Sequence, residues 1–346
     1  MTKEELIKNF NPNGVGVKNG NFIGLPFEEE HADLIIQPAP WDVTVSYGAG
    51  TSDGPTNILE ASVQLDLYDA DYPDFWKQGI YFRPVSMDML RLCQKLRPLA
   101  EAHIDFLESG GQLEKHTEAK DRLNQINAGN KEFQSYIYQN TKALLNQGKK
   151  VVLCGGSHST PLGYFQSLAE RYDTFGILQF DAHMDLRKAY EGFELSHASI
   201  MYNALQMKQI TKLVQVGIRD FCNEELELVE KQNERIKVFY DASIRRALYR
   251  GEHFKDIVQS IINELPSHVY ISFDIDALNP SLCPNTGTPV AGGLEIQEAF
   301  YILNELKKSG RIIIGADLNE VAGRPNEWDG NVGARVLYKL LGVLSK

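Results

Sequence analysis

The chain has 346 residues, of which 43% are hydrophobic and 23% charged, a composition typical of soluble globular proteins. Its formal net charge of −11 argues against a general nucleic-acid-binding surface, because contacts with phosphates need clustered Lys and Arg. No apolar run reaches the roughly 18 residues of a membrane span, and the N-terminus lacks the apolar core of a signal peptide. We therefore expect neither a nucleic-acid partner nor a membrane partner.

Short apolar runs alternate along the chain with longer amphipathic stretches. The runs are rich in Val, Ile and Phe without strict polar alternation, which favours strands that helices cover on both faces. Strands are predicted at 32–38, 149–156, 175–181, 212–220, 236–241, 268–276 and 311–320. Helices are predicted at 131–147, 161–172, 223–234, 242–264, 295–309 and 329–345. This alternation predicts an α/β fold with three α/β/α layers and a mostly parallel central sheet.

Residues 75–130 depart from the alternation. They are charged and helix-prone, and they contain no clear strand. We predict a helical insertion there, and oligomer contacts are one role for it. The insertion belongs to a single domain that spans residues 1–346. No internal repeat, low-complexity tract or linker divides the sequence.

The four cysteines, Cys93, Cys154, Cys222 and Cys283, are widely separated and form no CxxC pair. Disulfides persist mainly in oxidising compartments, where cysteines usually occur in regular pairs. We interpret these residues as reduced thiols, which predicts a cytoplasmic location.

Several predicted strands end in side chains that can bind metals. These are found in "CGGSHS", "FDAHMD" and "SFDIDAL", and the candidate ligands are His158, Asp181, His183, Asp185, Asp274 and Asp276. If the strands are parallel, their carboxyl ends meet at one edge of the sheet. Four carboxylates and two imidazoles could then hold two divalent cations roughly 3.5–4 Å apart. Mixed oxygen and nitrogen ligation favours Mn²⁺, with Ni, Co, Fe or Zn as alternatives.

Each of these clusters also has a simpler interpretation. An Asp at a strand end often faces solvent or caps a helix, and a lone His after "GGS" is often a loop residue. The combination at three strand ends favours the metal site, because four close aspartates without cations would repel one another. The segment "CGGSHST" lacks the GK[ST] ending of a phosphate loop and its basic residue, which argues against that interpretation.

These segments resemble the ureohydrolases, a family that includes arginase, agmatinase, formiminoglutamase and guanidino-acid hydrolases. The family signatures GGDHS, DAHxD and SxDxDxxDPxxAPGTGTP are similar to "GGSHS" (155–159), "DAHMD" (181–185) and "SFDIDALNPSLCPNTGTP" (272–289). The resemblance runs from about residue 32 to the C-terminus, outside the insertion. It implies an arginase-like fold, two Mn²⁺ ions on the six candidate ligands, and a homotrimer or homohexamer.

The resemblance also implies roles for three residues in the reaction. His197, in "ELSHASI", matches the catalytic histidine that delivers a proton to the leaving amine, although alone it would be read as an ordinary residue at a helix start. Glu320, in "DLNEV", matches the glutamate that holds the guanidinium group. Asp185 is the candidate acceptor for a proton from the attacking water.

The sequence departs from the family pattern near these residues. Ser157 replaces the Asp of GGDHS, Asn279 replaces the Asp of the DP pair, Ala198 replaces a common Gly, and "EVAG" replaces EVNP. None of these is a candidate ligand, but the neighbours of ligands orient them. The departures leave the metal preference and the substrate open.

The implied reaction is hydrolysis of a small cationic guanidino compound to urea and an amine. Arg187, Glu191 and Glu194, in the loop "LRKAYEGFELSHA" (186–198), are predicted to form the substrate rim. The two glutamates favour a distal ammonium, as in agmatine, whereas Arg187 would suit a carboxylate, as in arginine. We predict cleavage of agmatine to putrescine and urea, with arginase or another guanidino or formimino hydrolase as the alternative.

Two hypotheses from other classes compete with this prediction. A deacetylase-like hydrolase would use a single zinc ion, and a non-catalytic relative would keep the fold without the activity. His158, Asp185 and the pair Asp274 and Asp276 exceed what one zinc ion needs. The complete ligand set argues against both hypotheses.

Overall fold

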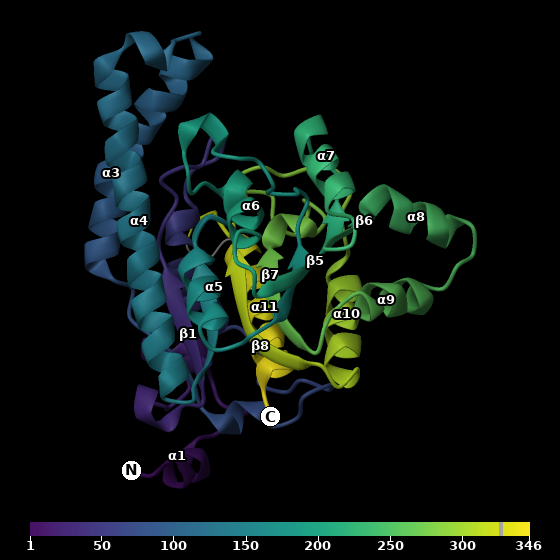
Figure 1. Ribbon diagram of the computed structural model, residues 1–346. Helices are drawn as coiled ribbons and strands as arrows, with labels where there is room; N and C mark the ends of the chain where they lie inside the picture. The colour runs from purple at the N-terminus through teal and green to yellow at the C-terminus, as the bar shows by residue number, and fades with distance from the viewer. Residues whose placement is uncertain (325–327) are drawn as a thin grey trace.

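A central sheet of eight strands organises the molecule, whose computed structural model describes residues 1–324 and 328–346. The strand order is β2-β1-β3-β8-β7-β4-β5-β6, and all neighbouring strands are parallel. The strands are β1 (Leu34–Ala39), β2 (Ile80–Phe82), β3 (Lys150–Gly155), β4 (Phe175–Phe180), β5 (Ile210–Ile218), β6 (Ile236–Tyr240), β7 (His268–Asp274) and β8 (Ile312–Asn319). Helices surround the sheet (Figure 1), which confirms the predicted α/β/α fold.

Helices cover the sheet on both sides. They are α1 (Lys3–Asn9), α2 (Gly54–Ser62), α3 (Met87–Glu108), α4 (Thr117–Asn146), α5 (Leu162–Ala169), α6 (Ile200–Ala204), α7 (Asn223–Lys231), α8 (Asp241–Tyr249), α9 (Phe254–Asn263), α10 (Ile296–Lys308) and α11 (Trp328–Leu344). None of these helices, within the residues described, combines the length and hydrophobicity of a membrane span.

Two separate apolar layers explain why the strands show no strict alternation. Val152 of β3 packs in the layer that includes α2, α10 and α11, whereas its neighbours Val151 and Leu153 pack in the layer that includes α4 and α5. Both faces of a strand are therefore buried, as in other parallel sheets between helices.

The region predicted as a helical insertion contains more than helices. β2 lies within it, pairs only with β1 and forms one edge of the sheet, so the prediction of no strand there was wrong. Three residues are too short to give a recognisable pattern. The predicted boundary at residue 130 falls inside the 30-residue helix α4, which runs beside α3 as a long hairpin on one side of the sheet (Figure 1).

One predicted helix, 242–264, is two helices in the structure. α8 ends before Gly251, whose φ of +88° lies in the left-handed region that favours glycine, and α9 begins at Phe254. That the whole chain is a single domain stays a prediction.

Candidate metal centre and active site

The candidate ligands and Glu320 converge because four neighbouring parallel strands end beside one another. His158 follows β3, Asp181 follows β4, Asp274 ends β7, and Glu320 follows β8. These strands stand in the order β3-β8-β7-β4 in the middle of the sheet. The structure therefore confirms the prediction that these strand ends meet at one edge of the sheet.

The first cluster surrounds the His158 imidazole. Its Nδ1 lies 2.9 Å from Asp181 Oδ2, 3.1 Å from Asp185 Oδ2 and 3.3 Å from Asp274 Oδ2. All four side chains are buried. Three carboxylate oxygens thus point at one ring nitrogen within a space that one cation would fill.

The other side of the His158 ring determines which nitrogen carries the proton. Its Nε2 lies 2.8 Å from Ser272 Oγ, and the Ser272 hydroxyl donates to Asp317 Oδ1 at 3.1 Å. Because the hydroxyl proton is used on Asp317, the oxygen accepts from Nε2–H, and the lone pair of the neutral ring is on Nδ1. A ring nitrogen among three carboxylates needs a cation beside it. Without metal that cation is a proton, because the three aspartates raise the pKa of His158, and a metal ion would take the same place.

The second cluster surrounds His183. Its Nδ1 lies 3.0 Å from Asp276 Oδ2 and 3.5 Å from Asp181 Oδ1. Asp181 therefore faces both clusters, with Oδ2 toward His158 and Oδ1 toward His183. Two groups of ligands that share one carboxylate fit a pair of cations rather than a single zinc ion.

The concentration of buried charge shifts the pKa values in this region. Burial raises the pKa of Asp185 to about 7, and the negative charge of Asp181 adds to the rise. Burial alone would lower the pKa of His183, but Asp276 and Asp181 outweigh it and raise the value to about 12. Without metal, protons must neutralise this cluster, so divalent cations would compete with protons for the same atoms.

Two non-glycine residues of the site have left-handed backbone conformations. The φ angle is +56° at Asp185 and +63° at Glu320. Such conformations cost roughly 1–3 kcal/mol each and persist where neighbouring contacts hold them. The Asp185 carbonyl accepts hydrogen bonds from Met201 and Tyr202, and Glu320 is held between Gly156 and Thr286. The strain serves to direct both carboxylates toward the site.

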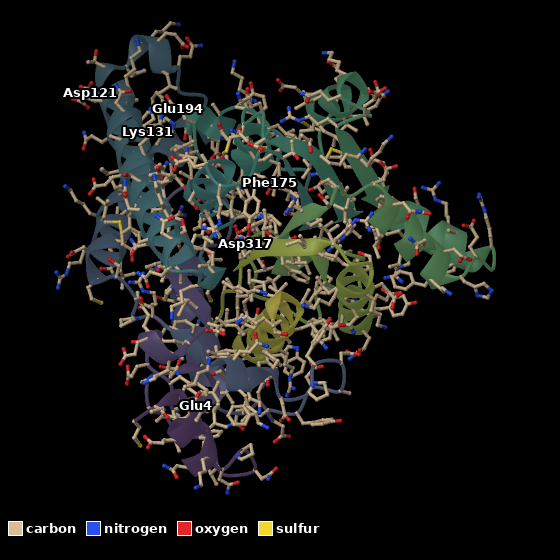
Figure 2. All side chains as sticks on the ribbon, turned by 60° about the horizontal axis from the view of Figure 1, so that its bottom comes forward. Glu4, Asp121, Lys131, Phe175, Glu194 and Asp317 are labelled. Carbon is tan, nitrogen blue, oxygen red and sulfur yellow. The ribbon has the colours of Figure 1, made fainter. Side chains whose placement is uncertain are left out.

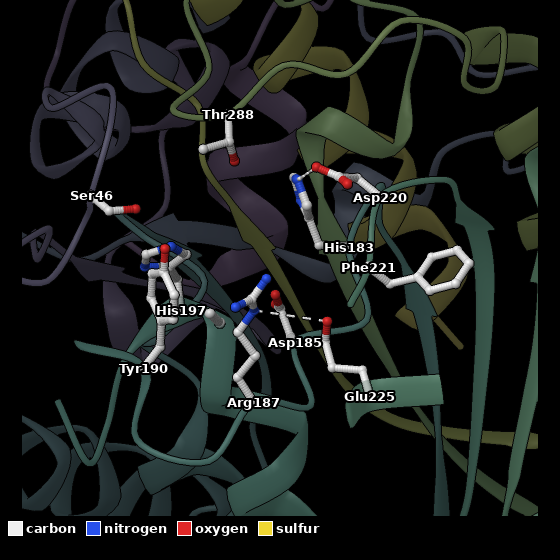
Figure 3. A pocket seen from close by; sticks show the side chains of 11 residues that line it. Ser46, His183, Asp185, Arg187, Tyr190, His197, Asp220, Phe221, Glu225 and Thr288 are labelled. Carbon is white, nitrogen blue, oxygen red and sulfur yellow. Dashed lines mark ion pairs between the residues drawn. The ribbon is translucent and has the colours of Figure 1, made fainter. Parts of the chain in front are cut away.

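A cavity of about 160 Å³ opens beside the ligands. Figure 3 shows its lining side chains, which come mainly from loops. The lining residues are Ser46, His183, Asp185, Arg187, Tyr190, His197, Ala198, Asp220, Phe221, Glu225 and Thr288.

His197 lies in the cavity wall, as a proton-transfer residue requires. Its Nδ1 is buried without a hydrogen-bond partner. Burial, together with the nearby cationic forms of His183 and His158, lowers its pKa to about 4. The ring is therefore neutral near pH 7.

Glu320 lies deeper than the cavity lining, directly beside the first cluster. Its Oε1 accepts a hydrogen bond from the backbone N–H of His158 at 2.7 Å, while Oε2 is buried without a partner among residues 1–324 and 328–346. Burial raises its pKa to about 8. A Cβ on Gly287 would lie 3.4 Å from Oε2, so this glycine keeps space beside the free oxygen.

The three predicted rim residues have different positions. Arg187 lines the cavity, with its guanidinium 4.8 Å above the Tyr190 ring and its Nε 3.8 Å from Glu225 Oε2. Glu194 is exposed and forms a 2.7 Å ion pair with Lys131 of α4 (Figure 2), so it does not reach the cavity.

Glu191 is also absent from the cavity lining. Its Oε2 is buried without a partner, and burial, followed by the charge of Glu108, raises its pKa. The assignment of Glu191 and Glu194 to the substrate pocket is therefore not supported. The Glu194 side chain and the Glu191 carbonyl both contact the α3–α4 hairpin, a contact that was not apparent from sequence.

Sequence reasoning missed the acidic residues on the opposite wall. Asp220 and Glu225 line the cavity and follow β5. Polar residues after an apolar strand marked the other four strand ends, and the same pattern is present here. Glu225 is buried and accepts hydrogen bonds from the backbone N–H groups of Leu186 and Cys222. The first bond fixes Glu225 to the loop that carries Arg187.

The departures from the family pattern occupy ordinary environments. Ser157 is buried, with its hydroxyl 2.7 Å from that of Ser159. Asn279 accepts hydrogen bonds from Ser281 in a turn, and Ala198 lines the cavity while its carbonyl accepts from Arg187 N–H. None of the three substitutions removes a member of either ligand cluster.

Comparison with known proteins agrees with this geometry. Residues 32–342 match the Arginase family. An agmatinase of Bacillus subtilis is 28% identical over 92% of this chain and 94% of its own length. An N(1)-aminopropylagmatine ureohydrolase of Thermococcus kodakarensis is 29% identical over 92% of this chain and 93% of its own.

Solved structures show the same fold. An agmatine ureohydrolase of Thermoplasma volcanium superimposes with a TM-score of 0.69 at 19% identity, over 99% of this chain and 97% of its own. A hypothetical agmatinase of Burkholderia thailandensis superimposes with a TM-score of 0.70 at 23% identity, over 96% of this chain and 92% of its own. Together with the family match, these findings confirm the predicted resemblance. The chain belongs to the arginase family.

Proposed function

We propose that this protein hydrolyses agmatine to putrescine and urea with two Mn²⁺ ions. The observation that carries the proposal is the pair of buried ligand clusters that share Asp181 beside a cavity with acidic walls. His158, Asp185 and Asp274 would hold one ion, and His183 and Asp276 the other. The mixed carboxylate and imidazole ligation is the support for manganese. Two such ions supply an activated water and stabilise developing negative charge.

The chain's own residues would position the substrate and move protons. The free Oε2 of Glu320 can accept a guanidinium N–H, which fixes the substrate carbon next to the clusters. Asp185 belongs to the first cluster and also lines the cavity, so it can receive a proton there. His197 is neutral and lines the same cavity, so it can carry a proton to the departing amine.

The charges of the cavity support a substrate with a second cationic group. Three carboxylates line the cavity, those of Asp185, Asp220 and Glu225, and Arg187 is the one Arg or Lys in the lining. Arg187 is already engaged by Glu225 and the Tyr190 ring, so it is poorly placed to bind an α-carboxylate. Agmatine carries an ammonium and no carboxylate, whereas arginine carries both. The names of the two relatives support the same class of substrate, with N(1)-aminopropylagmatine as the second candidate.

We also propose a cytoplasmic homotrimer or homohexamer. The support is family membership and four cysteines that are all free, three of them buried. Light scattering of the purified protein would measure the assembly directly.

Urea release from a panel of guanidines tests the substrate proposal. The metal-replete enzyme should give its highest kcat/KM with agmatine, followed by N(1)-aminopropylagmatine, and with lower values for arginine and guanidinobutyrate. A higher value for arginine would overturn the substrate assignment. Release of no urea from any member would overturn the proposed activity itself.

A further inference from the structure

Three amide side chains form a stripe along one face of α4. They are Asn127, Asn130 and Gln134, at positions i, i+3 and i+7. All three are buried on a face that is otherwise apolar. Because a buried amide is costly unless it is hydrogen-bonded, the stripe needs partners outside the helix.

Each amide binds a different loop at the edge of the sheet that carries the site. Asn130 Oδ1 accepts a hydrogen bond from Trp41 Nε1 at 3.1 Å. Gln134 donates to Ser159 O at 2.7 Å and accepts from Gly163 N at 2.8 Å, in the segment that follows His158. α4 therefore contacts the loops after β1 and β3 through hydrogen bonds of its side-chain amides.

Asn127 reaches the third loop, which carries His197. Its Nδ2 donates to Gly192 O at 3.1 Å, and its Oδ1 accepts from the Glu194 N–H at 3.1 Å. The two bonds bracket Phe193 as a neighbouring strand would. The amide offers this donor and this acceptor on two adjacent atoms and without charge.

Two further residues of the hairpin hold the same segment. His103 of α3 is fully buried and lies 2.9 Å, through Nε2, from the Glu191 carbonyl, which can only accept. Its ring also packs 5.2 Å from the Phe193 ring. Leu123 of α4 packs so closely on Gly192 that a Cβ there would lie 2.9 Å from its Cδ2.

The loop needs this external support because its backbone is strained. Ala189 and Glu191 have φ angles of +50° and +56°, in the left-handed region that non-glycine residues rarely adopt. The loop also extends to the cavity wall, where the Tyr190 and His197 rings lie edge-on, 6.4 Å apart. A shift of residues 191–194 would therefore move the wall that contains His197.

We propose that Asn127 is a positioning residue, which fixes the loop of residues 189–197 and thereby places His197 for proton transfer. The inference rests on the proposed function and on the role of His197 in it. Asn127 is not among the cavity-lining residues and belongs to neither ligand cluster. Its loss should therefore act on turnover and not on metal content.

Replacement of Asn127 by alanine tests this role. We expect Asn127→Ala to lower kcat on agmatine by about 10- to 100-fold, because small misplacements of catalytic groups have effects of that size. Two metal ions per chain should remain bound. In the His197→Ala background the same substitution should change kcat less than about twofold, because its effect passes through His197.

Lys131→Ala is the matched control. Lys131 lies one turn further along α4 and contacts the same loop only through its exposed ion pair with Glu194. Such pairs contribute little, so kcat should stay within about twofold of the wild type. Asn127→Asp keeps the acceptor for the Glu194 N–H but loses the donor, and it provides a milder variant if Asn127→Ala does not fold. Its kcat should lie between those of the wild type and Asn127→Ala.

Hydrogen exchange tests the contact independently of activity. The Glu194 amide should exchange faster in Asn127→Ala than in the wild type or in Lys131→Ala. Unchanged exchange, or a full additive loss of kcat in the His197→Ala background, would overturn the proposal. A wild-type protein that releases no urea would instead contradict the proposed function, while faster exchange would still support the positioning of the loop.

Discussion

The metal clusters and the substrate rim are built in different ways. The clusters lie at the ends of β3, β7 and β4 in the middle of the sheet, and their carboxylates are buried. The rim consists of loops after β4 and β5, and the helices α4 and α7 hold it from outside. Backbone hydrogen bonds of the sheet fix the first region, whereas side-chain contacts between distant segments fix the second. Chemistry is therefore more rigidly specified than substrate choice.

The largest effect should come from the residue that the two clusters share. We expect Asp181→Ala to reduce urea release to background and to lower metal content, because Asp181 faces both His158 and His183. The loss should exceed the roughly 10- to 100-fold that follows removal of a ligand's outer partner. Asp173→Ala, at an exposed position just before β4, is the control and should behave as the wild type. A metal-replete Asp181→Ala enzyme with normal turnover would contradict the shared-ligand geometry.

The next effect concerns proton transfer at the boundary between the two regions. His197→Ala should lower kcat by about 100-fold or more, the usual contribution of a general acid or base, while both ions stay bound. Metal analysis and steady-state kinetics check both parts. His253→Ala, at an exposed histidine, is the matched control and should have no effect. Loss of a metal ion from His197→Ala would show that His197 is a ligand.

A smaller effect is expected at the rim. Arg187→Ala removes the one guanidinium group of the cavity lining, so the preference for agmatine over arginine, measured as the ratio of kcat/KM values, should rise several-fold. Arg91→Ala, at an exposed residue of α3, should leave the ratio unchanged. A fall in the ratio would mean that Arg187 does not discriminate against the ammonium group, and that another residue selects the substrate.

The smallest effect should appear in the pH dependence of stability. In the metal-free protein Asp185 and Glu320 keep a proton up to pH values of about 7 and 8, whereas in the unfolded chain they lose it near pH 4. The folded state thus binds more protons between pH 6.5 and 8, so its stability falls as the pH rises through this window. His197, whose pKa is lowered, acts in the opposite direction, but only below about pH 6.5.

Metal should reverse this trend, because the ligands bind cations only after they lose their protons. Melting temperatures with Mn²⁺ and with a chelator should therefore differ more at pH 8 than at pH 6.5. An equal or smaller difference at pH 8 would contradict the placement of these carboxylates at the metals.

The same division explains what could be predicted from the sequence. The ligands stand at fixed spacings after apolar runs, so "DAHMD" and "SFDIDAL" carry the geometry of strand ends within a few residues. Seven of the strands were recognisable for the same reason. β2 was missed because three residues on a sheet edge form no pattern.

The rim could not be predicted because distant residues determine where its side chains point. Glu194 is a candidate for the pocket from sequence alone. In the structure Lys131 and Asn127, more than sixty residues earlier, hold it against α4. Glu225 resembles a simple helix cap until its bond to Leu186 places it against the rim. Such contacts depend on the packing of α4 and α7, which has no local signature in the loop.

A metal titration tests the central claim most directly. Metal-free protein would be titrated with Mn²⁺, and urea release from agmatine would be measured against the number of ions bound per chain. Two clusters that share Asp181 predict that activity reaches its plateau at two ions per chain. A plateau at one ion, or full activity without any, would contradict the two-metal site.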